Sequence, residues 1–269
     1  MHCHTAIERP TSIVLLTAAL LASVLPSSAL AASCHAASAV TTTPLYELYT
    51  SEGCSSCPPA DRWLAAHFPS QPAAGAPIAL AFHVDYWDSL GWKDRFASAD
   101  YTARQHASME ANHEGFVYTP QVLLQGKSLT RWHDIDPVAA ARKIAETPAA
   151  ARITLDASTT AARVDVRVEA ANQSARNARL FIAYADNDLS SQVKAGENRG
   201  VRLQHEHVVR ALHDAITIAA GTTRQAQVAL DLPSERGKLP AVVAFVQDSA
   251  SGQVLQALSV PLDGCAMAP

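Results

Sequence analysis

The sequence predicts an α/β domain followed by an all-β sandwich. Between residues 45 and 147, strand-like and helix-like segments alternate, which is typical of parallel strands joined by right-handed crossovers. From residue 153 onward, turns bearing Asn, Asp or Gly separate about eight short segments with alternating polarity, a spacing typical of an antiparallel sandwich.

The predicted elements of the first domain follow from apolar periodicity and from capping residues. The nearly continuous apolar run at 78–87 indicates a strand buried on both faces. Asp136 and Pro137 suit the N-cap and the first position of a closing helix. The expected order is strand, helix, strand, helix, strand, strand, helix, at residues 45–51, 60–68, 78–87, 99–112, 121–126, 128–133 and 136–146.

The chain begins with a predicted signal peptide. The apolar run at 12–25 is shorter than the roughly 20 residues that a transmembrane helix needs. Ala29-Leu30-Ala31 fits the small-x-small rule of signal peptidase. We therefore expect a periplasmic or secreted protein, with an uncleaved anchor or a lipoprotein attached at Cys34 as the alternatives. The predicted organisation is a signal peptide (1–32), an N-terminal linker (33–44), the α/β domain (45–147), a linker (148–152) and the sandwich with a C-terminal tail (153–269).

Composition restricts the expected partners. The net charge of -4 gives no basis for binding nucleic acid or an anionic membrane surface. No later segment is apolar and long enough to span a membrane, so we expect no membrane association after cleavage of the signal peptide.

Cysteine usage suggests disulfides. Of the five cysteines, Cys3 is removed with the signal peptide, and an exported protein can keep the remaining four oxidised. Three connectivities are possible. The spacing favours a Cys54–Cys57 pair and a structural Cys34–Cys265 pair that ties together the two ends of the mature chain.

The stretch "YTSEGCSSCPPADRW" places Cys54 and Cys57 between the first strand and the first helix. Free amides at a helix start stabilise negative charge and acidify a nearby thiol. Pro58 and Pro59 have no amide hydrogen and fit only the first helical turn, which puts the N-cap at Ser56 or Cys57. In a sheet of the predicted order, Asp85 and Thr119-Pro120 lie at the same edge as the two cysteines.

Two resemblances support a redox interpretation. The first predicted domain resembles the thioredoxin fold, and "YTPQVLLQG" is similar to the segment in which a cis-proline leads into a strand and a glycine turn. "ELYTSEGCSSCPPAD", "FHVDYWDSLGWKDRF" and "GVRLQHEHVVR" together resemble domain-of-unknown-function family 1223, a family of exported bacterial proteins. The resemblances imply a thioredoxin-like first domain with Pro120 in the cis form beside the cysteines. They also imply that Thr119 offers backbone groups to an extended thiol substrate. Unlike ordinary thioredoxins, this sequence has no tryptophan before Cys54.

The predicted function is thiol–disulfide exchange with thiols or disulfides of proteins or small molecules. Cys54 would attack, Cys57 would resolve the mixed disulfide, and Asp85 would accept the proton. No cofactor and no metal are required.

Two alternatives remain open. One is a binding module in which the cysteines form an inert disulfide. The other is a copper or zinc protein that adds imidazoles to the two thiolates; the candidates are His83, His106 and His113. Trp87, Trp92 and Phe96 are either packing residues or a lid over the site.

Overall fold

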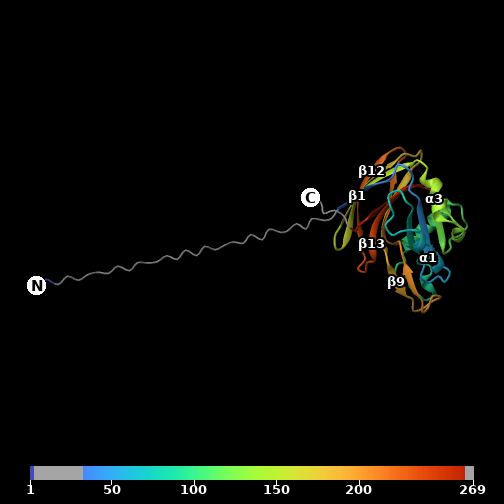
Figure 1. Ribbon diagram of the computed structural model, residues 1–269, viewed down its shortest axis with the longest axis horizontal. Coiled ribbons are helices and arrows are strands. Elements are labelled where there is room, and N and C mark those ends of the chain that lie inside the picture. Colours follow the sequence, from blue (N-terminus) through green and yellow to red (C-terminus); the bar gives the residue numbers. More distant parts are fainter. Residues whose placement is uncertain (3–32, 264–269) are drawn as a thin grey trace.

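The computed structural model describes residues 1–2 and 33–263, and it is built mainly from strands (Figure 1). The elements are β1 (Ser33–Ala37), β2 (Leu45–Thr50), α1 (Pro58–His67), β3 (Ile78–His83), η1 (Asp88–Leu90), α2 (Ala99–Ala111), β4 (Gln121–Leu124), β5 (Lys127–Ser128), η2 (Trp132–Asp134), α3 (Pro137–Ala145), β6 (Ala151–Thr159), β7 (Arg163–Asn172), β8 (Ala178–Asn187), β9 (Leu189–Gln192), β10 (Arg202–His205), β11 (Val208–Ile218), β12 (Thr223–Asp231), β13 (Lys238–Asp248) and β14 (Val254–Pro261).

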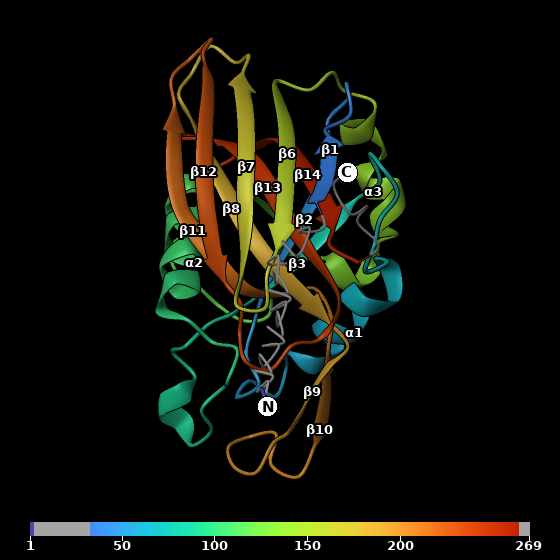
Figure 2. The same cartoon turned by 90° about the vertical axis from the view of Figure 1, so that its left-hand side faces the viewer.

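The central feature is a mixed eight-stranded sheet with the order β14-β13-β8-β11-β3-β2-β4-β5. Strands β2 and β3 are parallel, and β3 also pairs in parallel with β11, through Val208 and Ala81. A four-stranded antiparallel sheet, β1-β6-β7-β12, lies over part of it (Figure 2). The β9–β10 hairpin forms a sheet of its own and projects beyond the larger ones.

Both faces of the eight-stranded sheet are covered. On one face, Leu180 and Ile182 of β8 pack in the same cluster as Val166 of β7. Further along that face, helix α1 packs Leu64 against β2. On the opposite face, Tyr101 of α2 joins a cluster that runs from β2 to β13. The core is therefore divided by one continuous sheet.

The predicted fold class is wrong. Strands β2, β3, β4 and β5, from the region assigned to a thioredoxin-like domain, belong to the same sheet as β8, β11, β13 and β14, from the region assigned to a sandwich. The reason lies in burial. Nine of the ten residues of β8 are buried, so this strand is covered on both faces. A two-sheet sandwich requires strands with one exposed face.

Several local predictions are confirmed. Helices occur at Pro58–His67, Ala99–Ala111 and Pro137–Ala145, close to their expected positions, and Asp136 caps the last one. The expected strand at 128–133 is reduced to β5, because residues 132–134 form a 3-10 turn. The region predicted as an N-terminal linker contributes strand β1, which pairs with β6.

Two predictions fall on residues that the structure does not describe. Residues 3–32 of the predicted signal peptide are one case, and Cys265, the expected partner of Cys34, is the other. Within the described ranges, no helix is long and apolar enough to cross a membrane.

Candidate functional site: the Cys54–Cys57 disulfide

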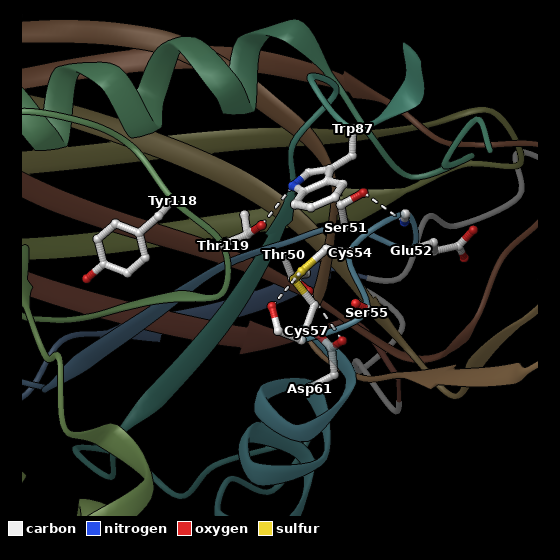
Figure 3. Close-up of a disulfide and its surroundings, with 12 residues drawn as sticks. Thr50, Ser51, Glu52, Cys54, Ser55, Cys57, Asp61, Trp87, Tyr118 and Thr119 are labelled. Carbon is white, nitrogen blue, oxygen red and sulfur yellow. Dashed lines mark hydrogen bonds between the residues drawn. A yellow bond between two sulfur atoms is a disulfide. The ribbon is translucent and has the colours of Figure 1, made fainter. Parts of the chain in front are cut away.

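Cys54 and Cys57 form a disulfide in the loop that joins β2 to α1 (Figure 3). Both cysteines are 0 % exposed, whereas the intervening Ser55 and Ser56 are exposed. A reagent in solution therefore reaches neither sulfur unless the residues that cover them move.

Helix α1 begins at this loop, with Cys57 as its N-cap and proline in its first turn. The sequence analysis expected free amides beside the sulfurs, but Pro58 and Pro59 carry none. The next two amides, of Ala60 and Asp61, both donate to the carbonyl oxygen of Cys57. The polar atom near the disulfide is instead the hydroxyl oxygen of Ser56, 3.4 Å from Sγ of Cys54.

The segment around Thr119, which the sequence analysis placed at the same edge as the cysteines, is linked to the cysteine loop through Trp87. The Thr119-Pro120 peptide bond is cis. The indole of Trp87 lies between this segment and the cysteine loop, and its Nε1 donates a hydrogen bond of 2.8 Å to the Thr119 hydroxyl (Figure 3). Gly53 packs on the same tryptophan so closely that a Cβ at Gly53 would approach Cβ of Trp87 to 3.1 Å. Trp87 thus joins the two predicted parts of the site.

Asp85 is engaged elsewhere. One of its carboxylate oxygens accepts a hydrogen bond of 2.6 Å from the Thr102 hydroxyl of helix α2. Its amide donates to the same hydroxyl oxygen at 3.1 Å. The structure therefore ties Asp85 to α2, and its predicted role as a proton acceptor stays a prediction.

Asp61 is a carboxyl group that the sequence analysis missed. It lies on α1, four residues after Cys57, a spacing that places both on one face of the helix. The Thr50 hydroxyl donates to its Oδ2 at 3.2 Å (Figure 3). Burial raises the pKa of Asp61, although the nearby imidazoles of His205 and His83 oppose this shift. The i, i+4 spacing was the available signal in the sequence.

Glu52, directly before Gly53, links the cysteine loop to its surroundings. Its side chain is 0 % exposed, accepts a hydrogen bond of 2.7 Å from Nε1 of Trp92 and faces Nε2 of His205 at 3.1 Å. Its amide donates to Oδ2 of Asp94 at 2.8 Å. A single buried carboxylate therefore connects the cysteine loop with the 86–96 loop and with strand β10.

Two buried imidazoles lie behind this carboxylate. Nδ1 of His83 is 2.6 Å from Oδ2 of Asp94, and the rings of His83 and His205 are 5.0 Å apart. Burial disfavours the charged form of His83, but the charge and hydrogen bond of Asp94, together with the charges of Asp61 and Glu52, raise the pKa of His83. Nε2 of His83 and Nδ1 of His205 are buried without a hydrogen-bond partner among the described residues.

A loop from the other half of the chain binds the backbone of the cysteine loop. We call residues 193–201, between β9 and β10, the cap loop. Nδ2 of Asn198 donates to the carbonyl oxygens of Glu52, at 2.9 Å, and Cys54, at 3.0 Å. The carboxylate of Glu197 accepts a hydrogen bond of 3.0 Å from the Ser55 amide. The cap loop therefore holds the Cys54–Ser55 peptide group through both its oxygen and its nitrogen.

The imidazoles considered for a metal site do not gather at the cysteines. His106 is exposed on α2, and His113 is exposed just beyond the end of that helix. His83 is paired with Asp94. Within residues 1–2 and 33–263, no three His, Cys, Asp or Glu side chains are arranged to hold a metal ion.

Comparison with known proteins gives a family and a fold. A family model described as "Protein of unknown function (DUF1223)" matches residues 45–247. Protein AGR_C_4864 from Agrobacterium tumefaciens is 24% identical, with 85% of this chain and 98% of that chain covered and a TM-score of 0.58, which indicates a similar fold. No protein with a curated description matches.

Two glycosidase structures also match over part of the chain. A beta-glucuronidase from glycoside hydrolase family 2 is 17% identical over 41% of this chain and 11% of its own, with a TM-score of 0.25. A beta-glucosidase from Kluyveromyces marxianus in complex with glucose is 10% identical over 51% of this chain and 18% of its own, with a TM-score of 0.23. These scores are too low to support an argument about fold or function.

Proposed function

Since the chain belongs to DUF1223, a family of unknown function, we propose its function from the site itself: thiol–disulfide exchange at Cys54–Cys57. The observation that carries the proposal is the disulfide between two cysteines only three positions apart, joined through Trp87 to the Thr119-Pro120 segment. The partners are thiols or disulfides of proteins or small molecules, met after export to the periplasm or beyond.

With a thiol partner, the reaction begins from the protein in which Cys54 and Cys57 form the disulfide. A partner thiolate attacks Sγ of Cys54, the Cys54–Cys57 bond breaks, and a mixed disulfide forms between the partner and Cys54. Cys57 leaves as a thiolate and takes a proton from Asp61, whose pKa is raised by burial. A second partner thiolate then attacks the mixed disulfide at the partner's sulfur. The partner leaves as a disulfide, and two electrons pass to the protein. Cys54 leaves as a thiolate and takes its proton from water, and water also returns a proton to Asp61.

The reverse direction uses the same groups. The Cys54 thiolate attacks a partner disulfide and releases one partner thiolate. Cys57 gives its proton to the Asp61 carboxylate and attacks Sγ of Cys54, which releases the second partner thiolate and restores the disulfide. Asp61 stands in this scheme where the sequence analysis placed Asp85, because Asp61 shares a helix face with Cys57.

Burial of both sulfurs favours a second candidate function. A disulfide that is 0 % exposed is also what an inert structural disulfide requires, in a protein that only binds its partners. The two candidates differ in one measurable property, which is whether the folded protein exchanges its disulfide with a thiol.

The test is a redox titration against glutathione buffers, with trapping in two single variants. Cys57→Ala should accumulate a mixed disulfide with glutathione at Cys54, detected by mass spectrometry. Cys54→Ala is the matched control, and preferential trapping there would reverse the assignment of attacker and resolver. If the folded wild-type protein stays oxidised in the most reducing buffer and neither variant is trapped, the disulfide is structural.

A further inference from the structure

The cap loop is positioned to control access to the disulfide. It belongs to the β9–β10 hairpin, which pairs with no other strand of the described chain, so no backbone ladder attaches it to the large sheets. Segments with few backbone hydrogen bonds to the rest of a protein open locally at low free energy. Opening of the hairpin therefore breaks side-chain contacts but no strand pairing of the large sheets.

The cap loop is held in place by contacts with the cysteine loop and with the 86–96 loop, where Gly196 packs against Trp92. Asn198 is buried, at 7 % exposure, and its side-chain nitrogen donates to two carbonyl oxygens, of Glu52 and Cys54. Glu197 accepts from the Ser55 amide. At the base of the hairpin, His205 faces the Glu52 carboxylate. The cysteine loop thus holds the hairpin at its tip and at its base, and Arg95 holds β9 by donating to the Ser191 hydroxyl and the Ser190 carbonyl oxygen.

These contacts fix the peptide group that carries Cys54. The oxygen of the Cys54–Ser55 peptide is held by Asn198 and its nitrogen by Glu197, so the plane of this peptide cannot turn while the cap loop is closed. Sγ of Cys54 is buried in this arrangement. A thiolate that attacks Sγ of Cys54 needs access to this sulfur, and with the cap loop closed Cys54 is 0 % exposed.

We propose that the cap loop is a latch on the disulfide and that Asn198 is the positioning residue that holds it closed. This inference rests on the proposed function. The latch opens before a partner thiolate reaches Cys54. The latch in this proposal binds the oxidised cysteine loop more tightly than the reduced one, and by linkage reduction of the disulfide weakens the latch.

The first experiment measures reduction of the folded protein by excess dithiothreitol. Asn198→Asp keeps the shape of the side chain and removes both hydrogen bonds, and Asn198→Ala removes the side chain. Because two hydrogen bonds that hold the latch closed are lost, the rate constant should rise by at least about tenfold. Lys194→Ala, an exposed change in the same loop, should leave it unaltered. An unaltered rate in both Asn198 variants contradicts the latch.

The second experiment measures hydrogen exchange of the Ser55 amide, and it does not depend on reduction by a thiol. Asn198→Ala should speed this exchange without affecting amides in the large sheets. The Cys54→Ser/Cys57→Ser variant, which mimics the reduced protein, should do the same. Equal protection in all three proteins overturns the inference.

The two experiments separate the latch from the proposed function. If opening the latch speeds reduction but Cys57→Ala still traps no mixed disulfide, the proposed function fails and the latch stands. If Cys57→Ala is trapped by glutathione while Asn198 variants react at the wild-type rate, the function stands and the latch fails.

Discussion

Nε1 of Trp87 donates a hydrogen bond of 2.8 Å to the hydroxyl of Thr119, and this contact joins the 86–96 loop to the residue before the cis-proline. Trp87→Phe removes the donor and keeps a ring, and Thr119→Val removes the acceptor. Each change should lower the free energy of unfolding by about 1 kcal/mol. Each should also speed reduction of the disulfide, because Trp87 covers the Thr119 side of the cysteine loop.

A double-mutant cycle checks this relationship. Urea unfolding and dithiothreitol kinetics of the two single variants and the double variant should give a coupling of about 1 kcal/mol. Phe116→Leu changes an exposed aromatic residue and is the control. Strictly additive effects would show that the contact does not contribute to the closed state.

Asp61 and Asp85 give opposite predictions for proton transfer. Asp61→Asn removes the carboxyl group on the same helix face as Cys57, and general acid–base catalysis contributes about 10² or more to a rate. We expect Asp61→Asn to slow exchange with glutathione by about that factor and to remove a carboxyl inflection from the pH–rate profile. Because burial raises the pKa of Asp61, that inflection should lie above the pH at which an ordinary aspartate titrates.

Asp85→Asn provides the comparison, since its carboxylate is bound to Thr102 of α2. We expect a pH–rate profile like that of the wild-type protein. If Asp85→Asn removes the inflection and Asp61→Asn does not, the original sequence-based assignment of Asp85 is correct.

The cysteine pair and the cis-proline could be predicted from the sequence, whereas the contact of the cap loop with the cysteine loop could not. The positions of Cys54 and Cys57 follow from a strand that precedes a Pro-Pro helix start. The cis peptide before Pro120 was expected from the resemblance to the thioredoxin fold. Asn198 lies 144 residues from Cys54 along the chain, and no periodicity or spacing connects them.

The fold class was mispredicted for a related reason. A single registered residue pair, Val208 with Ala81, joins β11 to β3 and merges the two predicted domains into one sheet. Local patterns predict that a segment is a strand, but they do not specify a distant partner. In addition, alternating polarity in the second half of the chain predicts strands with one exposed face. It therefore did not indicate that β8 is buried on both faces.

The buried ion pair between Arg104 and Glu47 should be important for stability. Nη2 of Arg104 is 2.6 Å from a Glu47 oxygen, with side-chain exposures of 5% and 0%. The guanidinium also lies 4.5 Å from the ring centre of Phe181. Removing one partner leaves a buried charge without compensation, which typically costs about 3–5 kcal/mol. Urea unfolding of Glu47→Gln should show a loss of this size.

The control for this prediction is the exposed pair between Arg163 and Asp165, at 3.0 Å. Surface pairs contribute about 0–1 kcal/mol, so Asp165→Asn should change stability little. Similar losses of unfolding free energy in Glu47→Gln and Asp165→Asn would contradict the expectation that burial makes the Arg104–Glu47 pair costlier to break than an exposed pair.

His207 should make the protein less stable in mild acid. Its ring is buried, Nε2 lies 3.1 Å from the Phe68 carbonyl oxygen, and burial lowers the pKa of His207 from 6.5 to about 4. Between these values the unfolded chain binds a proton that the folded protein does not. The contribution of His207 is therefore fully present above pH 6.5 and falls as the pH drops toward 4. The free energy of unfolding should decrease by roughly 3 kcal/mol over this window.

His207→Asn isolates this effect from other titrating groups. The backbone of His207 has φ 59, and asparagine adopts positive φ more readily than most residues, so the substitution removes the titration with little backbone cost. The variant loses the bond to Phe68, which lowers stability equally at every pH. The difference between wild type and variant should therefore shrink from pH 7 to pH 4 in urea unfolding. His106→Gln, an exposed change on α2, should leave the pH dependence as it is. A difference that is constant with pH would mean that His207 is protonated in the folded protein as readily as in the unfolded chain.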